Sequence, residues 1–322
     1  MKLAESCRQY LSHCQINKRL SSHSMRAYER DLKHICEFYG PAKAVLDIDR
    51  EQLKALITWL NQSDLSQASI KRRVACLKAM FRWMELEDII ETNPFHKLEL
   101  KVKLPHRLPR NIPRQELITL LLSARHAAGL PLKARYSHDL LTRTIQRKNQ
   151  LNALTTLVAL ELMIATGIRV GELVSIELEQ IFWSEGKIRI LGKGHHERYV
   201  FLPDNEITVL VKSYQHLRQL ANPDHRHLLI NSRGKPATTQ FIRKLVNKLS
   251  EGTNVDRHIT PHMFRHSAAC ELLESGVDIR FVQRLLGHYS ISTTELYTHV
   301  TDNALQEQVC RASVLRGLTS KI

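Results

Sequence analysis

Apolar residues recur every three or four positions along most of this 322-residue chain, and this helical period constrains the fold more than any other feature. One pattern runs from Ser22 to Gly40-Pro41, a second follows Asp49, and a third starts near Ser66. A period of 3.6 residues is typical of amphipathic helices, while Gly-Pro pairs end helices and Asp or Ser residues begin them. We therefore predict a helical domain over residues 1–100.

The second part of the chain is predicted to be mostly helical with one small sheet. Helices are expected over 114–128 and 151–165, and the second of these is apolar on all sides, as in a buried core helix. Residues 187–191 and 198–202 alternate like two strands around the turn Gly192-Lys193-Gly194. Helical patterns then continue to the end of the chain. The fold class is therefore mainly α with a small antiparallel β-sheet.

Positive charge is concentrated in one segment of the sequence. The chain has 47 Lys and Arg against 32 Asp and Glu, a net charge of +15, and residues 101–148 alone hold 11 basic and 2 acidic side chains. Such a block attracts polyanions, most often nucleic acid, although a solvated basic linker explains the composition equally well. A membrane-surface role is disfavoured because prolines interrupt the block.

Three prolines divide the chain. Pro105, Pro109 and Pro113 lie among basic residues, and prolines so closely spaced favour an extended, partly stiff segment. We predict an interdomain linker over 101–113, between domains over 1–100 and 114–322. Residues 129–150 are weakly patterned and basic, and they are expected to form either a loop or a polar helix.

The sequence favours a cytoplasmic protein. Its first twenty residues carry charge throughout and lack the apolar core of a secretory signal. The apolar stretch 151–168 is interrupted by polar residues, so we interpret it as a core helix and not a membrane span. The six cysteines form no C-x-x-C pair and are expected to be reduced thiols.

Several short stretches carry residues suited to chemistry, although each is weak alone. They are Ala165–Leu173 with Arg169 and Glu172, the Lys193 turn, His262-Met263-Phe264-Arg265-His266, and Leu286-Gly287-His288 followed nine residues later by Tyr297. A buried arginine beside a glutamate is often only an ion pair, and a lysine in a turn is usually solvated. His262 and His266 have the spacing of a metal pair, but Met263 stands where a zincin carries its glutamate. We therefore predict no metal site.

Taken in order, these residues resemble the tyrosine recombinases, also called the phage integrase family. The match consists of Arg169, Lys193, His262-x-x-Arg265, His288 and Tyr297, and the stretch 260–300 is similar to the Xer branch and its mobile-element relatives. The resemblance extends over nearly the whole chain and implies a helical core-binding (SAM-like) domain followed by a catalytic domain. It departs at 129–150, which looks like an insertion.

The resemblance implies an enzyme that cuts DNA through Tyr297. The tyrosine would attack a phosphodiester and leave a 3′-phosphotyrosine and a free 5′-hydroxyl. Charge then gathers on the phosphate oxygens, where Arg169 and Arg265 would stabilise it, because guanidinium stays protonated and binds phosphate through paired hydrogen bonds.

Other matched residues receive supporting roles from the same resemblance. Lys193 would protonate the leaving 5′-oxygen, and His262 and His288 would donate hydrogen bonds to the phosphate or move the tyrosine proton. Glu172, one turn after Arg169, would orient that arginine or His262. The site would need no cofactor, metal or ATP, since cations supply the charge and the covalent intermediate keeps the energy of the broken bond.

Candidate DNA-contacting residues lie on the helix that starts near Ser66 and in the linker. The basic face of that helix and the basic linker positions are Lys71, Arg72, Arg73, Lys78, Arg82, Lys101, Lys103, Arg107 and Arg110. A plain solvated surface is the alternative, but cations on one face with no acid among them favour phosphate contacts. Two basic domains on an extended linker would close around duplex DNA, and we hypothesise that 129–150 adds phosphate contacts.

The tail is expected to serve assembly. Residues 302–322 carry apolar side chains at helical spacing, namely Leu305, Val309, Val314, Leu315 and Leu318. Packing on its own domain is one interpretation. The resemblance instead favours docking on a neighbouring protomer, which would build a homotetramer on double-stranded DNA with specific recombination sites. An accessory protein is a further candidate partner.

The leading hypothesis is therefore a site-specific DNA recombinase acting in integration, excision or resolution. A type IB topoisomerase would use similar residues on one duplex, and relaxation of supercoils without a second site would favour it. A non-catalytic DNA-binding protein is the other alternative, and it is disfavoured because every expected catalytic position is filled.

Overall fold

The computed structural model describes residues 1–96, 98, 111–192, 197–253, 255–287 and 302–312. The chain divides into two compact units, an N-terminal unit over Met1–Arg107 and a C-terminal unit over Leu108–Ile322. Each unit has its own hydrophobic core. The expected fold class, mainly α with a small antiparallel sheet, is confirmed. The domain limits at residues 100 and 113 stay a prediction.

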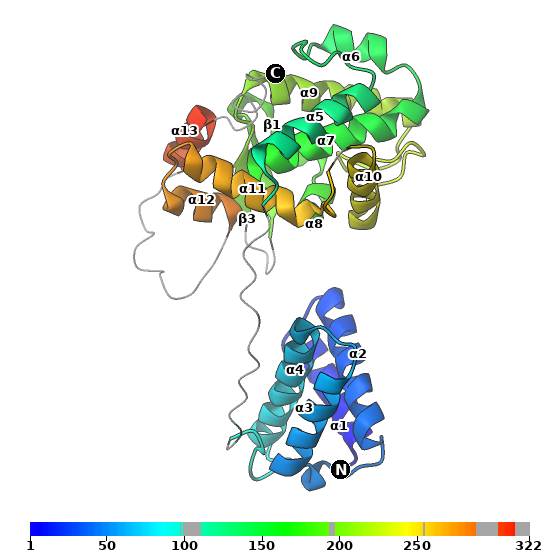
Figure 1. Ribbon diagram of the computed structural model, residues 1–322, viewed down its shortest axis with the longest axis vertical. Coiled ribbons are helices and arrows are strands. Elements are labelled where there is room, and N and C mark those ends of the chain that lie inside the picture. Colours follow the sequence, from blue (N-terminus) through cyan, green and yellow to red (C-terminus); the bar gives the residue numbers. More distant parts are fainter. Residues whose placement is uncertain (97, 99–110, 193–196, 254, 288–301, 313–322) are drawn as a thin grey trace. The chain divides into compact units, whose positions relative to one another are not determined.

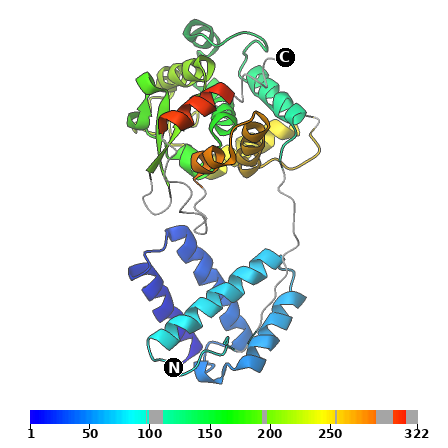
Figure 2. The same cartoon turned by 90° about the vertical axis from the view of Figure 1, so that its left-hand side faces the viewer.

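The N-terminal unit is a bundle of helices (Figure 2). Its long helices are α1 (Leu3–Ile16), α2 (Ser22–Tyr39), α3 (Arg50–Gln62) and α4 (Gln67–Leu86). The last three confirm the predicted helices, and their starts follow from local chemistry. Ser21, Asp49 and Ser66 each accept a hydrogen bond from the backbone amide three residues later, which satisfies an amide that has no partner within the helix.

The C-terminal unit is built around α7 (Leu151–Thr166), which confirms the predicted core helix. Nearly every α7 side chain is buried, against α5 (Arg114–Ala127), α9 (Asn205–Leu217), α10 (Thr239–Glu251) and α11 (Pro261–Glu274). Figure 1 shows α5 and α7 side by side. Of the helices in the described ranges, none combines the length and the apolar character needed to cross a membrane.

The sheet of the C-terminal unit has the order β1-β2-β3 and is antiparallel throughout. The strands β2 (Lys187–Leu191) and β3 (Glu197–Phe201) confirm the predicted pair, with the second strand one residue earlier than expected. Strand β1 (Ile181–Phe182) was not predicted, because two residues are too few to show alternation. Residues 193–196, including the tip of the predicted turn, lie outside the described ranges.

The weakly patterned segment 129–150 contains the short helix α6 (His138–Thr144). Its apolar residues Tyr136, Leu141 and Ile145 belong to the core of the C-terminal unit. The Tyr136 hydroxyl donates a hydrogen bond to Glu161 of α7. This segment is therefore an integral part of the unit, and its predicted DNA contacts stay a prediction.

The helix α13 (Asp302–Ala312) follows α12 (Ile279–Leu286) in the described chain and packs on its own unit. Val309 is buried there, and the side-chain amide of Gln306 donates to the carbonyl oxygen of Glu185 at 2.7 Å. In this single chain α13 therefore packs on its own unit, and the expected docking on a neighbouring protomer stays a prediction. Residues 313–322, with Val314, Leu315 and Leu318, lie outside the described residues.

Candidate active site

Arg169 is placed by a sharp turn at the end of α7. Gly167 ends the helix with φ 62°, and Arg169 is the N-cap of the short helix α8 (Val170–Val174). A Cβ atom on Gly167 would lie 2.6 Å from the side chain of Leu286, closer than two such atoms approach. Glycine is favoured here, since it adopts positive φ freely and requires no shift of the Leu286 side chain.

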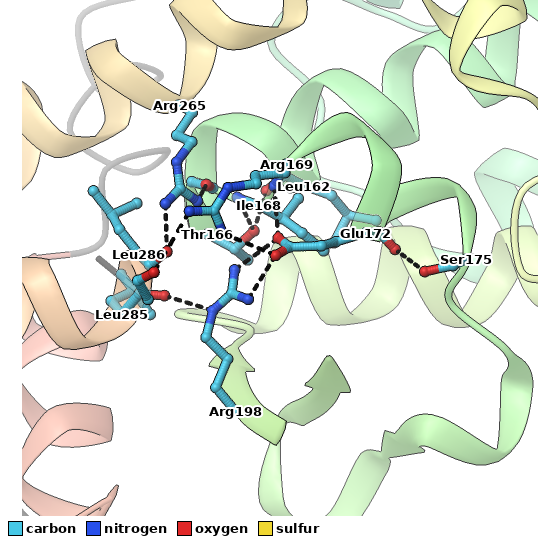
Figure 3. A network of polar contacts seen from close by, with 12 residues as sticks. Leu162, Thr166, Ile168, Arg169, Glu172, Ser175, Arg198, Arg265, Leu285 and Leu286 are labelled. Carbon is cyan, nitrogen blue, oxygen red and sulfur yellow. Dashed lines mark hydrogen bonds and ion pairs between the residues drawn. The ribbon is translucent and has the colours of Figure 1, made fainter. Parts of the chain in front are cut away.

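Glu172 lies at the centre of the arginine cluster drawn in Figure 3. Its Oε2 accepts the backbone amide of Arg169 at 3.0 Å, and its Oε1 accepts Nη1 of the same arginine at 2.9 Å. Arg198 of β3 donates Nη1 and Nη2 to the two oxygens, each at 2.8 Å. Burial disfavours the charged carboxylate, but the hydrogen bonds and charge of Arg198 and the hydrogen bonds from Arg169 outweigh it and lower the pKa of Glu172 to about 2.

Arg265 comes from α11, which begins at Pro261, and only 3% of the residue is exposed. Its Nη1 donates to the carbonyl of Gly167 at 2.7 Å, and its Nη2 donates to the carbonyl of Leu286. Burial and the neighbouring charge of Arg169 lower the pKa of Arg265 to about 10. The guanidinium is therefore still protonated at neutral pH.

The C-terminus of α12 meets these arginines. Arg198 donates Nε to the carbonyl of Leu285 at 3.0 Å, Arg265 donates to that of Leu286, and Nη2 of Arg169 lies 3.5 Å from that of Gly287. Helix ends leave carbonyl groups without intrahelical partners. Here three consecutive carbonyls are capped by three arginines from three different elements.

The cluster carries surplus positive charge, because the guanidinium groups of Arg169, Arg198 and Arg265 surround the single carboxylate of Glu172. Arg198 is 14% exposed, whereas the side chain of Arg169 is 44% exposed. One edge of the cluster is therefore open to solvent through Arg169. A partly buried group of guanidinium ions with too few carboxylates attracts an anion able to accept paired hydrogen bonds, such as a phosphate.

The structure brings together some of the predicted catalytic residues. Arg169, Glu172 and Arg265 meet, and Glu172 contacts the arginine, one of the two partners suggested for it. His262 is exposed on α11, one turn before Arg265. Lys193, His288 and Tyr297 lie outside the described residues. Within the part of the chain that is described, no group of three or more His, Cys, Asp and Glu side chains is arranged to hold a metal ion.

The predicted DNA-contacting residues of α4 fall into two groups. Lys71, Lys78 and Arg82 are exposed. Arg72 and Arg73 are instead half-buried beside the buried carboxylate of Asp31, at N–O distances of 2.5 and 3.8 Å. The DNA contacts of all five stay a prediction, and Arg72 and Arg73 have an alternative role within the bundle. The linker residues Lys101, Lys103, Arg107 and Arg110 lie outside the described residues.

Sequence reasoning missed Arg198. The residue stands at the start of a predicted strand, where an arginine usually points to solvent. Its partners Glu172 and Leu285 are distant in the sequence, so no local spacing links the three. The sequence offered only a weak indication, because Arg198 is the first residue of an otherwise apolar predicted strand in a segment that was already expected to lie near the site.

Comparisons with known proteins identify the family of this chain. The model of the phage integrase family matches residues 135–304, and that of the phage integrase N-terminal SAM-like domain matches residues 7–88. A tyrosine recombinase of Agathobacter rectalis is 33% identical over 298 residues, which are 90% of each chain. The tyrosine recombinase XerC of Oceanobacillus iheyensis is 32% identical over 304 residues, 92% of each chain.

Solved structures show the same fold. The XerH site-specific recombinase bound to difH substrate has a TM-score of 0.63 at 23% identity, covering 94% of this chain and 82% of that one. A lambda integrase tetramer bound to a Holliday junction has a TM-score of 0.66 at 17% identity, covering 91% and 79%. With the family match over more than half of the sequence, this chain belongs to the phage integrase family, the tyrosine recombinases.

Proposed function

We propose that this protein is a site-specific DNA recombinase that cuts and rejoins strands through a 3′-phosphotyrosine on Tyr297. One observation carries the proposal. Arg169 and Arg265, from separate elements, meet in a partly buried cluster whose positive charge exceeds the negative charge of its one carboxylate. Such a cluster suits a phosphodiester, which carries one negative charge and gains more in the transition state.

The arginines supply preorganised charge stabilisation. Glu172 fixes Arg169 by two hydrogen bonds, and backbone carbonyls fix Arg265, so neither guanidinium has to reorient when charge develops on the phosphate. Arg169 presents its exposed edge to the DNA. A partly buried site strengthens these interactions, because less water competes for the phosphate oxygens.

The remaining roles concern protons. The Tyr297 oxygen forms a bond to phosphorus while the bond to the 5′-oxygen breaks, and Lys193 gives that oxygen its proton. His262 and His288 donate hydrogen bonds to the phosphate or accept the proton that the tyrosine loses. Rejoining reverses these steps with a 5′-hydroxyl from the partner duplex. Because one phosphate ester replaces another, no ATP is consumed.

The partners proposed are double-stranded DNA with specific recombination sites and three further copies of the chain. The solved relatives named above include one recombinase on its DNA substrate and one tetramer on a Holliday junction. Lys71, Lys78 and Arg82 are exposed and suited to phosphate contacts in the N-terminal unit. We place the protein in the cytoplasm, and an accessory protein is a candidate partner.

Covalent trapping tests the proposal without knowledge of the target sequence. A pool of duplexes, randomised on both sides of a nick, is incubated with the protein, and adducts that survive denaturing detergent are selected and sequenced. Cleavage next to a nick releases a short fragment, which prevents rejoining and accumulates the intermediate. Wild type should trap a defined sequence and Tyr297→Phe should not.

The same experiment separates the alternatives. An adduct formed by the Tyr297→Phe variant would place the nucleophile elsewhere and overturn the assignment. Relaxation of supercoiled DNA that lacks the selected sequence would favour a topoisomerase. Exchange between two duplexes that both carry the sequence, and none when one lacks it, is the result expected of a site-specific recombinase.

A further inference from the structure

Arg198 holds two elements at the same time. Its Nη1 and Nη2 each donate to an oxygen of Glu172, and its Nε donates to the backbone carbonyl of Leu285. Figure 3 shows the guanidinium between these two partners. All three nitrogens have acceptors and the side chain is 14% exposed, so the group is fixed in the protein and turned away from bulk solvent.

Each partner of Arg198 is connected to one of the two arginines proposed to bind phosphate. Glu172 holds the backbone and side chain of Arg169 through two further hydrogen bonds. Leu285 is followed by Leu286, whose carbonyl accepts a hydrogen bond from Arg265. A shift of Arg198 would therefore move the carboxylate that orients one arginine and the helix end that orients the other.

The end of α12 is closely packed against the stem of Arg198. A Cβ atom built on Gly287 would lie 3.3 Å from the Cδ of this arginine. The side chain therefore fills the space beside the helix end and supplies hydrogen bonds to it. Glu172, by contrast, contacts Arg198 through the Nη1 and Nη2 atoms of the guanidinium.

We propose that Arg198 is a positioning residue for strand cleavage, which sets Arg169 through Glu172 and Arg265 through the C-terminus of α12. The inference rests on the proposed function. We assign Arg198 no contact with the DNA phosphate, because each of its three nitrogens already donates to a protein acceptor and its side chain is only 14% exposed. Lysine cannot replace it, since a single ammonium does not span the carboxylate and the carbonyl with the fixed geometry of a guanidinium.

The test compares Arg198→Lys and Arg198→Gln with wild type and with Arg189→Lys as the matched control. Arg189 lies in the neighbouring strand β2, opposite Tyr199, and among the described residues it gives no hydrogen bond to Glu172. The nicked duplex selected with wild type serves as the probe. Its Kd and the single-turnover rate of adduct formation at saturating duplex are measured for each protein.

Both Arg198 variants should bind the duplex within about twofold of wild type and form adduct about 100-fold more slowly, because a misplacement of about 1 Å costs that much in rate. Arg189→Lys should match wild type in both measurements. Cleavage at the wild-type rate by Arg198→Lys would show that charge alone suffices and would overturn the proposal. A weakened Kd with an unchanged rate at saturation would also overturn it, by making Arg198 a DNA contact.

A second readout does not depend on activity. Arg198 holds the pKa of Glu172 down to about 2, so its loss returns that pKa toward the usual 4.5. The Tm gap between wild type and Arg198→Lys should be widest near pH 7 and narrow below pH 4.5, where the wild-type carboxylate begins to lose its advantage over the unfolded chain. A Tm gap that does not change with pH would show that Arg198 does not lower the pKa of Glu172, and would overturn the proposal. This result would be informative even if no duplex gave an adduct and the proposed function itself failed.

Discussion

Glu161 and Glu172, two of the buried glutamates in the described part of the C-terminal unit, have different surroundings. Glu172 accepts hydrogen bonds from two arginines and has a pKa lowered to about 2. Glu161 on α7 accepts one from the Tyr136 hydroxyl, and burial raises its pKa to about 7. Arg125 lies near that tyrosine, with its guanidinium 4.3 Å from the ring centroid, and only partly offsets the burial.

The difference in pKa determines the charge of each carboxyl near neutral pH. The carboxylate of Glu172 stays charged throughout the physiological range and orients cations, so it suits a site that binds phosphate. Glu161 is protonated or charged depending on pH and joins the segment around Tyr136 to the core helix. Burial alone therefore does not set the charge of a carboxyl, because guanidinium donors around it can outweigh the effect of burial on its pKa.

Glu172→Gln gives the largest expected effect. The change removes the negative charge and leaves three buried or half-buried arginines without a counterion, and breaking a buried pair in this way costs about 3–5 kcal/mol of unfolding free energy. Adduct formation should fall by about 100-fold, because Arg169 loses its orientation. Urea denaturation and the trapping assay measure the two effects. A variant as stable and active as wild type would contradict the conclusion that Glu172, unlike Glu161, orients the arginines.

Glu161→Gln should act in the opposite direction. A folded pKa of about 7, above the unfolded 4.5, means that the stabilising contribution of this group is complete below pH 4.5 and is lost as pH rises to about 7. The variant should therefore be more stable than wild type at pH 8, by up to about 3 kcal/mol, and equal to it near pH 4.5. Denaturation across this range measures the slope, and a variant less stable at pH 8 would contradict it.

Gly167→Ala tests how tightly the arginine region is packed. The new Cβ would meet the Leu286 side chain at 2.6 Å and would have to adopt φ 62°, so we expect a loss of about 2 kcal/mol. Adduct formation should fall as well, because Gly167 and Leu286 provide the carbonyls that hold Arg265. Gly276→Ala is the control, since that glycine also has positive φ but nothing lies within 4 Å of its Cβ position. Equal losses of stability and cleavage in the two variants would show that backbone strain alone, and not the contact with Leu286, explains the Gly167 result.

Tyr136→Phe should have the smallest effect. It removes one hydroxyl that donates to Glu161, for a cost of about 1 kcal/mol. Cleavage at saturating duplex should not change, since Tyr136 and Glu161 are separate from the arginine cluster. A large loss of cleavage with little loss of stability would mean that the two regions are coupled.

The sequence predicted the parts of the fold that depend on local chemistry. Helix starts at Asp49 and Ser66 and the stop at Gly40 were read from the residues themselves, because capping and positive φ act over a few positions. The two longer strands were visible as alternation, while β1 was too short to be seen. The arginines 169 and 265 were found through motif order and not through any local pattern.

Contacts between distant residues were not predictable in the same way. Arg198 reaches Glu172 and Leu285 across the fold, and Tyr136 reaches Glu161 from a segment without clear periodicity. Glu161 was visible only as a polar interruption of an apolar helix. The apolar spacing of Val309 predicts that this side chain is buried, but the spacing does not show that α13 contacts β3 and α12.

Identification of the residue that joins the DNA tests the central claim most directly. The adduct from the selected nicked duplex is digested with protease and nuclease, and the remaining nucleotide-linked peptide is sequenced by mass spectrometry. The account predicts one peptide, in which Tyr297 carries a 3′-phosphate. Attachment to any other residue, or through a 5′-phosphate, would contradict it.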